Sequence, residues 1–154
     1  MSDLRILIAD DHAAVRHGIR SLLSSHDGWE VLAEAADGLE AVEKTEQLHP
    51  DVVLLDIAMP NLNGIQAARK ILNHDPQAKV LIITVHANKH VANEAMHLGA
   101  SGFLSKTDAV RDLIRAVETV EGGGRFFPML EPEIHERKDG DKLKYLAWSR
   151  TGND

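Results

Sequence analysis

The sequence predicts an α/β protein in which five strands alternate with five helices around one parallel sheet. Two observations predict this class. Short apolar runs of strand length recur five times along the chain, and a segment with apolar residues at helical spacing follows each of them. Such units join parallel neighbours by right-handed crossovers. The pattern covers residues 4–121, so we expect one doubly wound (βα)5 domain.

The expected strands are apolar runs that end at charged, hydroxyl or turn residues. They lie at 4–9, 29–33, 51–56 and 79–85, with a shorter strand centred on 103–104. The run at 51–56 is apolar on both of its alternating faces, which is typical of a strand at the centre of a parallel sheet.

The expected helices begin and end at residues that favour helix boundaries. Asp37 begins the second helix, and Glu40 follows at the spacing of a capping box. Gly99 ends the fourth helix, and the glycines from Gly122 onward end the fifth. On the fifth helix we expect four residues to face the core, namely Val110, Leu113, Ile114 and Val117.

The composition of the 154 residues excludes several classes of protein. The chain has no cysteine, which excludes a disulfide framework, thiolate metal sites and a cysteine nucleophile. Its formal net charge of −7 disfavours general binding to nucleic acid, so we do not expect DNA as a partner. No apolar run reaches the roughly 18 residues of a membrane span, and no signal peptide is evident. We therefore expect a cytoplasmic protein without membrane contact.

Charged and hydroxyl side chains follow four of the expected strands, at the edge of the sheet where such folds bind ligands. Asp10 and Asp11 follow the first strand, and Asp56 ends the third. Thr84 lies near the end of the fourth strand, and Lys106 follows the fifth. Each residue alone has an ordinary explanation as a turn cap or a surface group. Their joint placement predicts one site.

The residue types at this edge indicate phosphoryl chemistry. Crowded carboxylates repel one another, and a divalent cation relieves that repulsion. Oxygen ligands favour Mg²⁺, which we expect as the cofactor. A cation, an ammonium and a hydroxyl together stabilise a transferring phosphoryl group. A carboxylate can itself be the nucleophile and form an aspartyl phosphate.

The motifs around these residues resemble the receiver domain of two-component response regulators. The matching segments are 10–11, 56–60 with Asn63-Gly64, Thr84 and 99–106. The resemblance implies a flavodoxin-like sheet with strand order 2-1-3-4-5. It also implies a signalling switch rather than an enzyme, one that catalyses only its own phosphorylation and dephosphorylation.

The resemblance implies a role for each residue of the site. Asp56 accepts the phosphoryl group, and Lys106 pairs with the phosphoryl oxygens. Asp11 and Asp56 ligate Mg²⁺ together with the backbone carbonyl of Ala58, while Asp10 acts mainly through water.

The resemblance further implies a switch and its partners. Thr84 hydrogen-bonds the phosphoryl group and moves its loop, and Phe103 matches the aromatic residue that turns inward with that movement. The affected surface runs roughly from residue 87 to 121. A sensor histidine kinase or a phosphotransfer protein supplies the phosphoryl group, an output protein receives the signal, and a homodimer is compatible with the family.

Two features are similar to receivers of the LuxR-type helix-turn-helix subfamily. Lys106 lacks the following proline of many receivers, and His86 lies two residues after the expected switch threonine. We expect the receiver domain at 1–124 and a short, partly ordered extension at 125–154 that is too short for a helix-turn-helix domain. Within that extension, Tyr145 and Trp148 are candidates for a partner or dimer contact.

Other functions remain as alternatives. The first is a DNA-binding transcriptional regulator that is represented here without its effector domain. The second is a haloacid-dehalogenase-like phosphatase, which needs an acid where this chain has Ala58. The third is a flavodoxin, which needs a hydroxyl- and glycine-rich phosphate loop after the first strand, where Asp10 and Asp11 of this chain would repel phosphate. On the first helix, Arg16, His17 and Arg20 are expected either to face solvent or to contact the kinase. The scattered histidines indicate no metal site, even at His86 and His90.

Overall fold

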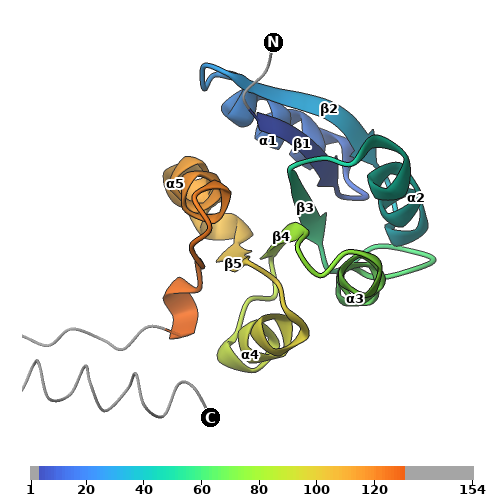
Figure 1. Ribbon diagram of the computed structural model, residues 1–154. Helices are drawn as coiled ribbons and strands as arrows, with labels where there is room; N and C mark the ends of the chain where they lie inside the picture. Colours follow the sequence, from blue (N-terminus) through green and yellow to red (C-terminus); the bar gives the residue numbers. More distant parts are fainter. Residues whose placement is uncertain (1–3, 131–154) are drawn as a thin grey trace, which may run out of the picture.

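The computed structural model describes residues 4–130 and confirms the predicted architecture (Figure 1). Five parallel strands form one sheet in the order β2-β1-β3-β4-β5. The strands are β1 (Leu4–Ala9), β2 (Trp29–Ala35), β3 (Val52–Asp56), β4 (Lys79–Thr84) and β5 (Gly102–Ser105). The helices are α1 (Ala13–Ser24), α2 (Gly38–Leu48), α3 (Gly64–His74), α4 (Lys89–Leu98) and α5 (Ala109–Glu121), with 3-10 turns η1 (Lys106–Asp108) and η2 (Pro128–Leu130).

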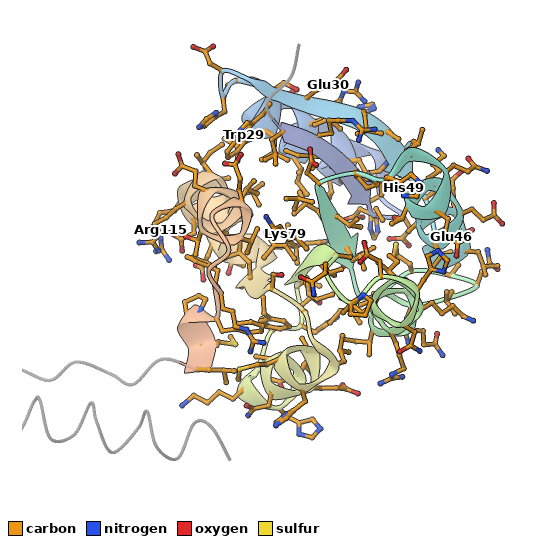
Figure 2. The ribbon with its side chains drawn as sticks, viewed as in Figure 1. Trp29, Glu30, Glu46, His49, Lys79 and Arg115 are labelled. Carbon is orange, nitrogen blue, oxygen red and sulfur yellow. The ribbon has the colours of Figure 1, made fainter. Side chains whose placement is uncertain are left out.

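Helices cover both faces of the sheet, because alternate strand residues point to opposite sides. Ile6 and Ile8 of β1 pack in the core beneath α1 and α5. Leu7 and Ala9 of the same strand pack in the core beneath α2, α3 and α4. Figure 1 shows α1 and α5 on one side and the other three helices across the sheet from them. Trp29 and Lys79, labelled in Figure 2, begin β2 and β4 and so mark the amino-terminal edge, opposite the strand ends considered below.

Local side-chain hydrogen bonds set the helix starts. Asp37 caps α2 by accepting the backbone N–H of Glu40 at 2.8 Å, as the spacing predicts. The second bond of the predicted capping box is different, since the Glu40 carboxylate accepts the N–H of Ala36 instead of that of the cap. A complete capping box forms at α3, where Asn63 and Gln66 bond to each other's backbone N–H.

The prediction for the inward face of the fifth helix is wrong at Val110, which is 85% exposed. The buried stripe of α5 begins at Ala109 and continues through Leu113 and Val117. Because successive helical residues are rotated by about 100°, Val110 turns away from the sheet when its predecessor packs against it.

The chain beyond α5 returns to the sheet. Phe126 lies beside β5, where its N–H donates to Ser101 and its carbonyl accepts the N–H of Phe103 at 2.8 Å. Phe126 and Phe127 are both buried. The domain boundary after residue 124 stays a prediction. The predicted contact residues Tyr145 and Trp148 lie outside the described residues.

Candidate functional site

Asp10 and Asp56 lie side by side because the strands that precede them are neighbours. β1 pairs with β3 so that Ala9 is opposite Leu55, one residue before each aspartate. The side chains of Asp10 and Asp56 are only 1% and 3% exposed, whereas Asp11 is exposed. The sheet therefore buries two of the three predicted carboxylates next to each other and leaves the third at the surface.

Lys106 supplies the positive charge of this site. It begins η1 directly after β5, and its Nζ lies 2.7 Å from Asp10 Oδ2 and 3.3 Å from Asp56 Oδ1. Both of these oxygens are buried, and each has two lone pairs, of which the ammonium uses at most one. The ammonium thus holds both carboxylates by charge, and both retain the capacity to bind a further positive group.

The charges of the site influence one another. Burial and the neighbouring charge of Asp10 raise the pKa of Asp56, and Lys106 offsets only part of that effect. Burial alone would lower the pKa of Lys106, but its contacts with Asp10 and Asp56 outweigh burial and raise that pKa. The ammonium therefore stays charged, and one cation faces two buried acids.

Arg16 fixes the turn that carries Asp10. Its Nη1 donates to the backbone carbonyl of Asp10 at 2.6 Å, and its Nε donates to Glu34 Oε1 of β2 at 2.9 Å. Arg20 also donates to Glu34. Burial would raise the pKa of Glu34, but the hydrogen bonds from Arg20 and Arg16 outweigh burial and lower it.

The sequence did not reveal this positioning role of Arg16. Its side chain is 17% exposed, so the predicted solvent-facing interpretation is wrong for this residue, whereas Arg20 is 48% exposed. His17 is exposed, which agrees with the prediction that this helix face is directed to solvent. A kinase contact at this face stays a prediction.

The loop after Asp56 depends on a glycine. The N–H groups of Met59 and Gly64 both donate to the carbonyl of Ile57, at 2.9 Å each, and so fold the loop tightly. A Cβ atom at Gly64 would lie 2.0 Å from the carbonyl oxygen of Asp56, so only glycine permits this approach. Ala58 lies exposed in the same loop.

The two residues predicted to switch are buried. Thr84 ends β4 with 1% exposure, and its hydroxyl accepts the N–H of His86 at 3.2 Å. Thr84 pairs with Ser105, the residue before Lys106, so the hydroxyl and the ammonium belong to the same edge. Phe103 is 1% exposed and packs in the core beneath α2, α3 and α4.

The acidic residues form a donor set suited to a divalent cation. Asp10, Asp11, His12 and Asp56 each offer one ligand atom, and these atoms all lie within 4.8 Å of one another. Carboxylate oxygens with unused acceptor capacity fit Mg²⁺. His12 belongs to this donor set, whereas the spacing of the histidines along the chain indicates no metal site; its position directly after Asp11 is the signal for it.

The fold and this donor set agree with comparison to known proteins. Residues 6–118 match the family model described as the response regulator receiver domain. The chain belongs to the response regulator receiver family. The receiver is a signalling switch, and the predicted family and flavodoxin-like fold are confirmed.

Some of the curated relatives are named as transcriptional regulatory proteins and others as response regulators. The transcriptional regulatory protein DegU of Brevibacillus brevis is 38% identical over 123 residues, which make up 80% of this chain and 52% of DegU. The receiver therefore spans about half the length of this relative.

Solved structures share the same fold. A LuxR-family two-component response regulator from Aurantimonas sp. SI85-9A1 has a TM-score of 0.79 and 34% identity, with 97% of this chain and 99% of that chain covered. The CheX-CheY-BeF3-Mg complex from Borrelia burgdorferi contains a chain with a TM-score of 0.74 and 28% identity, covering 77% of this chain and 90% of that one. Across residues 4–130, no helix of the receiver has the length and apolar character needed to cross a membrane.

Proposed function

We propose that this receiver is the phosphoacceptor of a two-component phosphorelay and that Asp56 takes the phosphoryl group. The observation that supports the proposal most strongly is the position of Lys106, 3.3 Å from Asp56 and 2.7 Å from Asp10. A carboxylate that attacks phosphorus needs positive charge beside it to hold the phosphoryl oxygens. Here the ammonium is nearly buried, at 13% exposure, so water screens its charge less than at an open surface.

The proposed transfer moves the group from a phosphohistidine to Asp56. An oxygen of Asp56 forms a bond to phosphorus, while the bond between phosphorus and the imidazole nitrogen of the donor breaks. The electron pair of that bond leaves with the imidazole. A sensor histidine kinase or a phosphotransfer protein is the donor, and we therefore propose the cytoplasm as the place of the exchange. Lys106 offsets part of the charge that the new phosphoryl oxygens bring into the site.

We propose Mg²⁺ as the cofactor, held by the carboxylates of Asp11 and Asp56 and the carbonyl of Ala58, with Asp10 acting through water. When bound, this ion supplies positive charge to the phosphoryl oxygens. The buried carboxylates of Asp10 and Asp56, which share the single ammonium of Lys106, support this assignment. The relative whose solved complex is described with Mg²⁺ supports it as well.

The proposed switch couples Asp56 to the surface of α4, β5 and α5. Thr84 lies at the edge of the sheet and donates its hydroxyl to the phosphoryl group, which draws the following loop inward. Phe103, which is already buried in the core beneath α2, α3 and α4, secures the new position. An output protein, or a second copy of the receiver, then binds the altered surface between residues 87 and 121.

Intact-mass measurement with acetyl phosphate tests the assignment of Asp56. We expect the wild-type chain to gain one phosphoryl group only when Mg²⁺ is present, and Asp56→Asn to gain none. Asp75→Asn, which replaces an exposed aspartate at the end of α3, serves as the matched control and is expected to label like wild type. Equal labelling of wild type and Asp56→Asn would contradict the proposal.

A second candidate function is the control of transcription through a DNA-binding domain outside this sequence. The names of the relatives favour it, since DegU is a transcriptional regulatory protein. The net charge of −7 argues that the chain itself does not hold duplex DNA at physiological salt. A gel shift at micromolar protein tests this, because a specific and salt-sensitive shift would assign DNA binding to the chain itself.

A further inference from the structure

His12 adds an imidazole nitrogen to the carboxylate cluster. Its Nδ1 lies 3.0 Å from Asp11 Oδ1 and 3.5 Å from Asp10 Oδ1. With Asp56, these residues are the four whose ligand atoms gather within 4.8 Å. The donor set therefore contains a nitrogen as well as oxygens, and that changes which metals it prefers.

The backbone of His12 is fixed relative to the buried acids. His12 is the N-cap of α1, and its N–H donates to Asp10 Oδ1 at 2.8 Å. Its carbonyl accepts the N–H of Arg16 at 3.0 Å. The imidazole makes no capping hydrogen bond, so the ring is not needed to start the helix.

Two buried oxygens of this cluster have acceptor capacity to spare. Asp10 Oδ2 and Asp56 Oδ1 are buried, and both are paired with the one ammonium of Lys106, which leaves lone pairs on each oxygen. Two buried carboxylates that share one cation carry an excess of negative charge, and a second bound cation offsets it. The cluster thus contains buried ligand atoms for a cation, which a group of exposed surface acids does not.

The distance between the His12 nitrogen and the nearest Asp11 oxygen fits two ligand atoms of one metal ion. Two ligand atoms at right angles, each about 2.1 Å from one metal, lie about 3.0 Å apart. The distance from His12 Nδ1 to Asp11 Oδ1 is 3.0 Å. Imidazole suits zinc, nickel and copper ions, whereas Mg²⁺ prefers oxygen ligands and water.

We propose that His12 makes this cluster a site for divalent transition-metal ions, in which its imidazole is a ligand alongside Asp10, Asp11 and Asp56. The inference rests on the cation site of the proposed function and extends it to a second class of metal. His12 strengthens the binding of ions such as Ni²⁺ and Zn²⁺ but contributes no ligand to Mg²⁺. The two classes of ion compete for the same carboxylates.

Calorimetric titration of the full chain with Ni²⁺ and with Mg²⁺, at one fixed neutral pH, tests this proposal. The variants are His12→Gln and the control His17→Gln, which removes an exposed histidine of the same helix. We expect excess Mg²⁺ to weaken Ni²⁺ binding to wild type. We expect the ratio of Ni²⁺ affinity to Mg²⁺ affinity to fall about tenfold or more in His12→Gln, a loss typical of disturbed metal sites, and to stay unchanged in His17→Gln.

The outcomes separate this inference from the proposed function. An unchanged affinity ratio in His12→Gln would overturn the role of His12 as a ligand, even if Mg²⁺ binds well. It would mean that the imidazole only lies in contact with Asp11. Wild-type protein that binds Ni²⁺ in a His12-dependent way but does not bind Mg²⁺ would support His12 as a ligand and contradict both the proposed competition and Mg²⁺ as the cofactor.

Discussion

Lys106 and Asp10 form an ion pair of 2.7 Å that joins the residue after β5 to the residue after β1. The pair spans the ends of β3 and β4, which lie between those strands in the sheet. Because the same ammonium is 3.3 Å from Asp56, one cation serves two buried acids. This shortage of positive charge is the basis of the first two predictions.

Lys106→Ala is expected to fold but to uncouple phosphorylation from its effect on the α4-β5-α5 surface. Loss of one partner of a buried ion pair costs up to about 3–5 kcal/mol, and bound Mg²⁺ should restore part of it. Thermal unfolding with and without Mg²⁺ measures the first effect, and amide hydrogen exchange before and after phosphorylation measures the second. Lys70→Ala, at an exposed position of α3, is the control. If Lys106→Ala shows no cooperative unfolding even with Mg²⁺, the residue is structural.

Asp56→Asn is expected to unfold at a higher temperature than wild type in Mg²⁺-free buffer near neutral pH. Burial and the charge of Asp10 raise the pKa of Asp56 in the folded state. Stability is therefore greatest below the unfolded pKa, where Asp56 is protonated in both states, and falls as pH rises through the folded pKa. The gain from Asp56→Asn should shrink as pH is lowered toward about 4. Asp27→Asn, at an exposed turn, should show no such gain.

Arg16→Ala is expected to weaken Mg²⁺ binding by about 10–100-fold, the range for residues that orient metal ligands. Its guanidinium holds the carbonyl of Asp10 at 2.6 Å and also binds Glu34. Arg20→Ala is a matched control, because Arg20 binds the same Glu34 but has no contact with Asp10 among the hydrogen bonds of residues 4–130. Calorimetric titration measures the Mg²⁺ affinity of both variants. Equal losses of Mg²⁺ affinity would show that the contact with Glu34, not the contact with Asp10, is responsible.

Gly64→Ala is expected to destabilise the protein by about 1–3 kcal/mol, the usual cost of overpacking, and to slow phosphorylation. The new Cβ would meet the Asp56 carbonyl oxygen at 2.0 Å, so the backbone that carries Asp56 has to move. Gly18→Ala is the contrasting variant, because nothing lies within 4 Å of its Cβ position and the site is inside α1. It should gain about 0.5–1 kcal/mol in urea unfolding. A change in the free energy of unfolding that has the same sign in both variants would contradict this prediction.

Ala58→Asn is expected to shorten the lifetime of the phosphorylated protein. Ala58 and His86 are both exposed and lie two residues after Asp56 and Thr84. Because both follow strand ends at the edge that carries Asp56, we expect them to flank the approach of the hydrolytic water. Ala58 offers no hydrogen bond to that water, and one such bond is worth about 1 kcal/mol, or roughly fivefold in rate. His86→Ala should also speed decay by opening the path. Decay of the phosphoprotein can be followed by intact mass, and unchanged rates in both variants would exclude these positions from control of the lifetime.

The strands were predictable because each is a short, mostly apolar run that is followed by polar or turn residues, even though β1 contains Arg5 and β2 contains Glu30 and Glu34. The same pattern placed Asp10, Asp56 and Lys106 at one edge, since the ends of parallel strands meet there. The strand order came from the resemblance to receivers, because apolar runs alone do not say which strands are neighbours.

Three features could not be predicted from the sequence: a side chain that binds a backbone group, the exact face that a helix buries, and the direction of a side chain. Arg16 binds the carbonyl of Asp10, and a backbone carbonyl has no residue type to recognise. Val110 fits an apolar stripe by spacing, but the first turn of α5 buries its neighbour Ala109 instead. His12 follows a known motif directly, yet its ring direction becomes visible only in three dimensions.

Location of the phosphorylated residue tests the central claim most directly. After treatment with acetyl phosphate and Mg²⁺, borohydride reduction converts an aspartyl phosphate to homoserine, which peptide mass spectrometry assigns to one position. We predict homoserine at position 56 alone, and none when Mg²⁺ is withheld. Homoserine at position 10 or 11, or a phosphoryl group that resists reduction, would contradict the assignment of Asp56 as the phosphoacceptor.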